Sequence, residues 1–308
     1  MTLLAGVDIG GTKTAAALVT PEGVLLDRAT LPTPARQGPA AVLDTAARAV
    51  TLLGRPVDAV GVGSAGVIDP GTGRVRSATS ALPGWGGTDL RGLLAARLGL
   101  PVGVDNDVNA HALGEYWRGA AAGHACVLLL TVGTGVGGCV LIDGRVHHGA
   151  GGAAGEAGHL PVPAAAGLPC PCGGVGHVEA AASGPAMTAA YRELAGARPG
   201  HGTGAAPATL RLVNSRAQDG DPTALTVLRA GATALGEAVG GLVNVLAPDL
   251  VLLGGGVSRC GPVWWDTLRT TVASHLVPAV AGTPLRAGSL GDDAALYGAA
   301  LLGREALA

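Results

Sequence analysis

Short apolar runs separated by glycine turns dominate the first part of the chain and predict strands. Such runs cover residues 3–8, 14–19 and 57–62, and the turn between the first two is Gly10-Gly11-Thr12. Runs of this length, bounded by turn residues, are typical of buried strands. Residues 38–53 differ, because their apolar positions recur at helical spacing. The mixture of strands and helices predicts an α/β fold.

The same hairpin pattern recurs about half a chain later. An apolar run at 127–132 meets the turn Gly133-Thr134-Gly135, and a second apolar run follows to Ile142. The glycine spacing satisfies a dinucleotide-binding fingerprint, but that site requires a helix after the glycines, and here we expect a strand. The two hairpins instead suggest duplicated halves that face one cleft, each offering a turn to a polyphosphate.

The rest of the chain is predominantly helical by its pattern. We expect helices over 180–195, 208–217, 222–246, 263–276 and 292–302, a Gly/Pro/Ala loop at 196–207, and a strand at 250–253 that enters the Gly254-Gly255-Gly256 turn. A strand that leads into three glycines suits close backbone approach to a nucleotide, although a plain strand-to-helix turn is the alternative.

Composition narrows the class of ligand and the compartment. The net charge of -2 offers no basic surface for nucleic acid, so small neutral or anionic ligands fit better. The chain has neither a basic leader nor an apolar run of membrane-spanning length, which predicts a cytoplasmic protein without a membrane partner. Its five cysteines do not suggest a disulfide framework.

The stretch 155–179, GEAGHLPVPAAAGLPCPCGGVGHVE, concentrates chemically active side chains. Its soft donors are His159, Cys170, Cys172 and His177. Thiolates and imidazoles are the ligands of closed tetrahedral zinc sites, so we expect structural zinc here; two reduced thiols in a Gly/Pro loop are the alternative. Glu156 and Glu179 flank these donors and can hydrogen-bond a polar ligand.

A second polar cluster, Asp105-Asn106-Asp107-Val108-Asn109, follows the strand predicted at 101–104 and precedes a helix expected from Ala110. Open α/β sheets bind ligands at the carboxyl ends of their strands. The Asp107 carboxylate could therefore accept the proton of an attacking hydroxyl, with Asn106 orienting the sugar. Alternatively, Asp107 or Asn109 only caps the helix.

Together these motifs resemble the ROK family of sugar kinases and sugar-responsive repressors. The matching stretches are DIGGTK at 8–13, DNDVN at 105–109, GTGVGG at 133–138, GEAGH at 155–159 and CPCGGVGHVE at 170–179. The chain departs from the family pattern at three positions. His177 replaces a cysteine, Asp105 replaces a glutamate, and Ala81 stands where ROK glucokinases usually carry an asparagine before Leu-Pro-Gly-Trp.

The resemblance implies a two-domain actin/hexokinase-like (ribonuclease H-like) α/β fold with a cleft between duplicated halves. We place the N-terminal domain at 1–117, completed by a C-terminal helix at 291–308. The C-terminal domain, with the zinc loop, is placed at 118–290. The family likeness also implies a homodimer or homotetramer.

The implied activity is transfer of the γ-phosphate of ATP to the 6-hydroxyl of an aldohexose, with N-acetylmannosamine or N-acetylglucosamine as the alternative acceptor. A sugar-responsive repressor is the other activity of the family. It is disfavoured because the phosphate hairpin begins within the first ten residues, whereas such repressors carry an N-terminal helix-turn-helix domain, and because the chain is acidic. A sugar-binding or scaffold protein without activity is the third possibility.

The resemblance also implies roles for individual residues. Asp107 acts as the general base, and the sugar contacts are Gly66, Asn106, Asp107, Glu156, His159 and Glu179. The contacts to ATP and Mg²⁺ are Asp8, Gly10, Gly11, Thr12 and Lys13 in the first hairpin, Thr131, Gly133, Thr134 and Gly135 in the second, and Gly254, Gly255 and Gly256 in the third turn. His159 gives one ring nitrogen to zinc and the other to the sugar.

Overall fold

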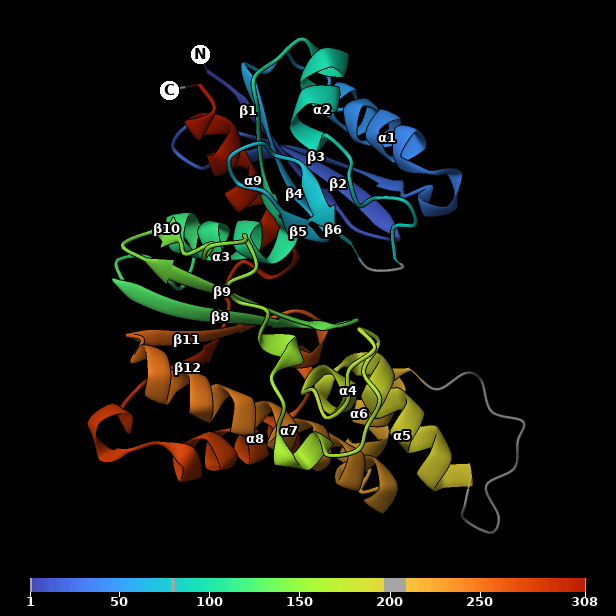
Figure 1. The fold of residues 1–308 in the computed structure, drawn as a ribbon, viewed down its shortest axis with the longest axis vertical. Helices are drawn as coiled ribbons and strands as arrows, with labels where there is room; N and C mark the ends of the chain where they lie inside the picture. The colour runs from blue at the N-terminus through green and yellow to red at the C-terminus, as the bar shows by residue number, and fades with distance from the viewer. Residues whose placement is uncertain (1, 79–80, 197–208, 308) are drawn as a thin grey trace. The chain divides into compact units, whose positions relative to one another are not determined.

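The computed structural model describes residues 2–78, 81–196 and 209–307, which form two compact units (Figure 1). Unit 1 comprises Met1–Val127, Cys139–Gly155 and Gly288–Ala308, and unit 2 comprises Leu128–Gly138 and Glu156–Ala287. The domain boundary predicted at residue 117 stays a prediction. Among the described residues, no helix has the length and apolar character needed to cross a membrane.

Unit 1 is built on a five-stranded sheet in the order β3-β2-β1-β4-β7. Its strands are β1 (Leu4–Ile9), β2 (Lys13–Val19), β3 (Leu25–Pro32), β4 (Ala59–Ser64) and β7 (Val102–Asn106). β1 pairs antiparallel with β2 and parallel with β4, and β7 continues the parallel part. Between β4 and β7 in the sequence, β5 (Val67–Ile68) and β6 (Val75–Ser77) form a separate short hairpin.

Helices cover both faces of this sheet because its side chains alternate between two cores. Leu18 belongs to a core with residues of α1 (Pro39–Thr51) and α2 (Leu90–Leu98), whereas Val19 packs with Leu296 of α9 (Ala294–Glu305). α9 also packs against α3 (Asp107–Arg118), so the last helix of the chain completes unit 1.

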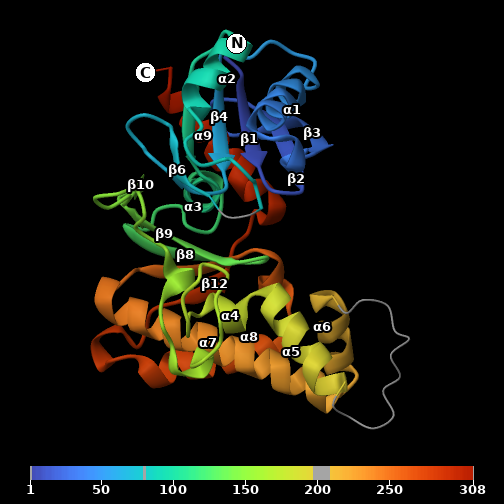
Figure 2. The ribbon, with the colours of Figure 1, turned by 45° about the vertical axis from the view of Figure 1, so that its right-hand side comes forward.

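The second sheet has the order β10-β9-β8-β11-β12. Its strands are β8 (Cys126–Val132), β9 (Val136–Ile142), β10 (Arg145–Val146), β11 (Leu250–Gly254) and β12 (Leu285–Ala287). A strand, not a helix, follows the Gly133–Gly135 turn, which confirms that this turn is no dinucleotide fingerprint. α7 (Pro222–Leu246) and α8 (Pro262–His275) lie side by side in unit 2 (Figure 2).

The single helix predicted over 180–195 is wrong, because α4 (Glu179–Ala182) and α5 (Gly184–Gly196) are separated at Ser183. Pro185 has no N–H to donate and its ring conflicts with a continuous helix, so the backbone of Ser183 is extended. The Ser183 hydroxyl then accepts a bond from the N–H of Ala186 at 3.3 Å.

The remaining predicted helices are present. α6 (Leu210–Gln218) precedes α7, and 3-10 turns occur at Ala35–Gln37, Ala157–His159, Pro163–Ala165, Gly256–Arg259, Pro278–Val280 and Gly291–Asp293. The loop predicted at 196–207 lies outside the described residues except for Gly196, which ends α5.

Candidate functional site

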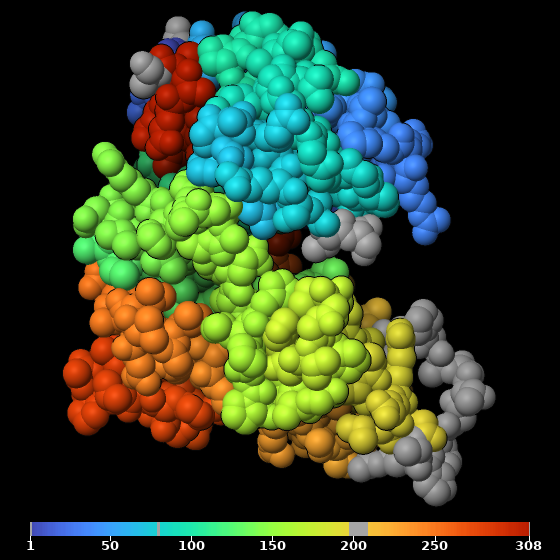
Figure 3. Space-filling model, viewed as in Figure 1, coloured from blue at the N-terminus to red at the C-terminus, as the bar shows by residue number. Residues whose placement is uncertain are grey.

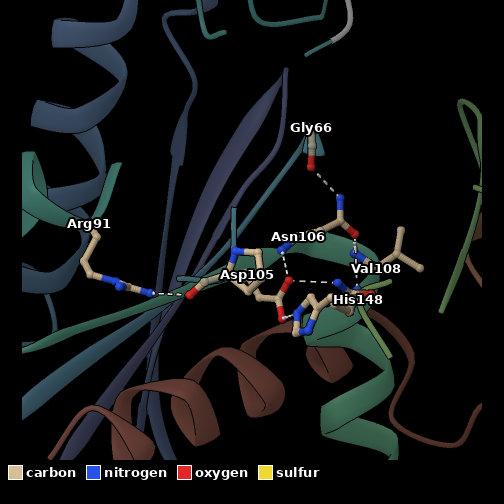
Figure 4. A network of polar contacts seen from close by, with 8 residues as sticks. Gly66, Arg91, Asp105, Asn106, Val108 and His148 are labelled. Carbon is tan, nitrogen blue, oxygen red and sulfur yellow. Dashed lines mark hydrogen bonds and ion pairs between the residues drawn. The ribbon is translucent and has the colours of Figure 1, made fainter. Parts of the chain in front are cut away.

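The polar cluster at the end of β7 forms the N-terminal turn of α3 (Figure 4). The cap is Asn106 and α3 begins at Asp107, so the expected helix start at Ala110 is wrong, and the alternative that Asp107 or Asn109 is the cap is wrong as well. The Asn106 Oδ1 accepts from the N–H groups of Val108 at 2.8 Å and Asn109 at 3.2 Å. A short polar side chain with β-region backbone is the standard cap, and here position 106 meets both conditions.

Gly66 lies within reach of this turn. Its carbonyl oxygen accepts a hydrogen bond from Asn106 Nδ2 at 2.9 Å. Gly66 has φ +105°, and a Cβ there would lie 2.5 Å from the Ser77 carbonyl oxygen, so only glycine fits. Among the described residues these are the bonds of the Asn106 side chain, which leaves one Nδ2 hydrogen for a ligand.

Asp8, at the end of β1, carries a perturbed carboxyl group. Burial, followed by the negative charge of Asp107, raises the pKa of Asp8 to about 7, while Lys13 opposes this effect. Asp8, Asp107 and Lys13, all predicted site residues or neighbours of the predicted phosphate turn, therefore interact electrostatically within unit 1. A divalent cation next to these carboxylates would replace the proton and relieve their repulsion.

Asp8→Asn is expected to flatten the pH dependence of stability. Because the pKa of Asp8 rises from an ordinary 3.8 to about 7 in the folded state, folded protein binds the extra proton, and its free energy of unfolding falls as pH rises from about 4 to about 7. That loss is at most about 4 kcal/mol. Thermal unfolding of the wild type, Asp8→Asn and the exposed control Asp27→Asn across this range measures it; parallel wild-type and Asp8→Asn curves would contradict the assignment.

The first glycine turn is closed by a backbone bond from Gly10 N to Lys13 O at 3.0 Å. Gly11 lies against residue 81, since a Cβ on Gly11 would be 3.0 Å from both the Cβ and the carbonyl oxygen of Ala81. The position where ROK glucokinases usually have asparagine is thus a neighbour of the predicted phosphate turn.

The second and third glycine turns adjoin each other in unit 2. Gly255 has φ +82°, and a Cβ there would collide with the backbone of Val132. Gly133, Thr134 and Gly256 line one pocket of about 770 Å³. Thr131 lies in β8 and Gly254 in β11. These two residues, and also Gly135 and Gly255, are not among the described residues that line this pocket.

Sequence analysis missed the charged part of this pocket. Among the described lining residues are three arginines and no carboxylate: Arg192, Arg211 and Arg259. They come from α5, α6 and the 3-10 turn at 256–259, so no local sequence motif indicates that they share a pocket. Guanidinium groups favour phosphate, which makes this pocket suitable for a polyanionic ligand.

The four predicted zinc donors converge. One ligand atom from each of His159, Cys170, Cys172 and His177 lies within 4.8 Å of all the others. Cys170 Sγ is 3.8 Å from His159 Nδ1, and Cys172 Sγ is 3.2 Å from His177 Nδ1. Zinc bonds of ordinary length place tetrahedral sulfur and nitrogen ligands about 3.5 Å apart. Donor types and spacing therefore fit a zinc ion.

Backbone bonds hold this loop in shape. Val162 N donates to Gly176 O at 3.0 Å, and Cys170 N donates to Gly174 O at 2.8 Å. Burial raises the pKa of the Cys170 thiol, so the metal would have to displace its proton. The loop, yellow-green in Figure 3, lies on the surface of unit 2.

His159 presents its two ring nitrogens to different groups. Nδ1 points toward Cys170, and Nε2 is 3.6 Å from Glu156 Oε2. Both side chains are partly exposed, at 36% for His159 and 48% for Glu156. This geometry is compatible with the predicted use of one nitrogen for zinc and the other for a sugar.

Glu179 has a partner that the sequence did not indicate. Its Oε2 accepts a hydrogen bond from Val136 N at 2.9 Å, directly after the Gly133–Gly135 turn. The carboxylate thereby links the first residue of α4 to the start of β9. Its predicted contact with sugar stays a prediction.

The two α/β units and their glycine-turn hairpins place the chain in the actin/hexokinase-like class, as predicted. The ROK family model matches residues 4–306. A glucokinase from Streptomyces coelicolor is 37% identical, covering 99% of this chain and 98% of that protein. An Escherichia coli N-acetylmannosamine kinase is 35% identical, covering 98% of both. The chain belongs to the ROK family, which confirms the resemblance of its motifs.

A solved structure agrees with this membership. The crystal structure of a ROK family glucokinase from Streptomyces griseus in complex with glucose and AMPPNP matches with a TM-score of 0.86 and 35% identity. The match covers 98% of this chain and 99% of the other. The similarity thus extends over the whole fold and is not confined to the motifs.

Proposed function

We propose that this chain is an ATP-dependent sugar kinase that phosphorylates the 6-hydroxyl of glucose. The observation that carries the proposal is the placement of Asp107 in the first turn of α3, beside Asp8 and the capping Asn106. The glucokinases among its relatives support the choice of glucose.

Asp107 is the proposed general base. Its carboxylate accepts the proton of the sugar 6-hydroxyl as that oxygen attacks the γ-phosphorus and the ADP oxygen leaves. The positive end of the α3 dipole stabilises the ionised carboxylate before the reaction. The remaining Nδ2 hydrogen of Asn106 is the proposed donor to a sugar oxygen, and the backbone of Gly66, which bonds Asn106, is the proposed neighbouring sugar contact.

The donor side uses backbone and cationic groups. The turns Gly10–Thr12 and Gly133–Gly135 are proposed to bind the phosphates, and Arg192, Arg211 and Arg259 supply positive charge in the pocket of unit 2. Asp8, through water, is the proposed protein contact of Mg²⁺. When bound, that ion neutralises charge on the transferring phosphoryl group.

The zinc loop is proposed to be structural. The four protein donors would close the coordination shell of a zinc ion and would leave no position for substrate on the metal. Glu156 and His159, together with Glu179 at the start of α4, are the proposed sugar contacts. The enzyme is proposed to be cytoplasmic and to form homodimers or homotetramers.

N-Acetylmannosamine is the second candidate acceptor. Ala81 offers a smaller side chain next to Gly11 than the asparagine usual in ROK glucokinases, which favours a bulkier sugar substituent. The E. coli N-acetylmannosamine kinase among the relatives makes this alternative concrete.

An ADP-release assay with Mg-ATP and a panel of hexoses and N-acyl hexosamines tests the function. Glucose is expected to give the highest kcat/KM, and Ala81→Asn is expected to lower the kcat/KM of N-acyl sugars more than that of glucose. A preference for N-acetylmannosamine would select the second candidate. No turnover on any member of the panel would overturn the proposal.

A further inference from the structure

Asp105 is a buried carboxylate beneath the first turn of α3. The residue is only 4% exposed, and both of its carboxylate oxygens have hydrogen-bond partners. Oδ1 accepts from Asn106 N at 2.7 Å and from Asn109 Nδ2 at 2.8 Å. Oδ2 is 2.8 Å from His148 Nε2, as Figure 4 shows.

These bonds act on both sides of Asp107. Asn106 precedes it and Asn109 follows it within one helical turn, so the position of the Asp105 carboxylate constrains the backbone that carries Asp107. A buried carboxylate is stable in such a position only when its oxygens are hydrogen-bonded. His148, 43 residues away in the sequence, supplies the bond to Oδ2.

Hydrogen bonds and packing contacts fix the loop that carries His148. The His148 carbonyl oxygen accepts from Ala154 N at 3.1 Å, and Gly152 packs against the Ile68 carbonyl. Arg91 donates to the neighbouring carbonyl oxygens of Pro70 at 3.0 Å and Gly71 at 2.7 Å. The imidazole therefore reaches Asp105 from an anchored support.

We propose that His148 is a positioning residue for phosphoryl transfer: by bonding Asp105 it fixes the first turn of α3 and thereby directs the Asp107 carboxylate at the acceptor hydroxyl. The role rests on the proposed kinase function, because it concerns the same base. His148 acts through Asp105 and is not assigned any contact with substrate.

Three variants test this role. His148→Leu removes the donor, His148→Gln keeps an N–H near the position of Nε2, and His147→Leu makes the same change at the exposed preceding residue. His148→Leu is expected to lower kcat about 10- to 100-fold with both KM values within about threefold, because misplaced catalytic groups cost rate. His148→Gln should recover most of kcat, and His147→Leu should match the wild type.

A double-mutant cycle with Asp105→Asn tests whether the two residues act as one unit. The double variant with His148→Leu is expected to be about as slow as the slower single variant. Multiplicative losses would overturn the proposal. So would unchanged kcat in His148→Leu, or a His148→Gln variant as slow as His148→Leu at a temperature where both remain folded.

Amide hydrogen exchange separates this proposal from the kinase function. In His148→Leu the N–H groups of Val108 and Asn109 should exchange faster, while those of α7 in unit 2 keep wild-type rates. Equal exchange at the α3 turn in both proteins would overturn the positioning role. If the wild type showed no kinase turnover, the proposed kinase function would be rejected. If the exchange difference between wild type and His148→Leu were still observed, the structural link between His148 and the α3 turn would remain supported.

Discussion

Asp107→Asn is expected to lower kcat by about 10²- to 10⁴-fold while the Kd for the sugar changes by less than about threefold. The amide keeps the shape of the side chain but cannot accept the proton of the attacking hydroxyl. The α3 turn should survive, because the Asn106 cap is untouched and the amide oxygen of asparagine can still accept the bond that Val108 N donates to Asp107 Oδ1 at 3.0 Å. Steady-state kinetics and sugar binding by calorimetry measure the two quantities.

Asp89→Asn provides the matched control. Asp89 is also an aspartate at a helix N-terminus in unit 1, where it caps α2 by accepting from Gly92 N. Asparagine caps equally well, so this variant should keep wild-type kcat. If Asp107→Asn turned over at the wild-type rate, Asp107 would not be the base.

Asp107→Asn should also lower the pKa of the Asp8 carboxyl group. Since the charge of Asp107 helps to raise the pKa of Asp8, removing that charge should bring the Asp8 pKa below about 7. Infrared or NMR titration of the Asp8 carboxyl reads this shift directly. An unchanged pKa would mean that the two carboxylates do not interact.

Removal of the proposed zinc ion is expected to have the second large effect. Cys172→Ser should reduce bound zinc from about one ion per chain to a small fraction, because serine is a poor zinc ligand. Loss of the ion should lower kcat/KM for sugar about tenfold or more, since the His159 ring and the adjacent Glu156 then lose the anchor that the metal would give them. Metal analysis and sugar kinetics of the same preparations measure both outcomes.

The chain itself offers controls for the metal site. His177→Cys is expected to retain zinc, because a thiolate there completes the ROK pattern, whereas His177→Ala should lose it. Cys126→Ser removes a thiol outside the cluster and should retain zinc. Wild-type protein that lacks stoichiometric zinc, with full activity in Cys172→Ser, would contradict the metal site.

Local patterns were sufficient for several parts of the site. The candidate zinc donors lie within 19 residues of sequence, so their types and spacing could be interpreted without the fold. The glycine turns were equally evident, because each lies between two apolar runs or directly after one. The apolar spacing of residues 180–195 predicts one helix, whereas Pro185 favours a break, and in the structure the helix is interrupted at Ser183.

The apolar periodicity, glycine turns and soft-donor spacing by themselves determined the α/β class, the hairpins and the candidate zinc ligands. Tertiary structure alone decided that Asn106 caps α3, that His148 bonds Asp105, and that arginines from α5, α6 and the 256–259 turn share one pocket. The reason is physical. Hydrophobic periodicity and turn propensity depend on neighbouring residues, whereas the partner of a buried polar group depends on which distant segment the packed core brings to it.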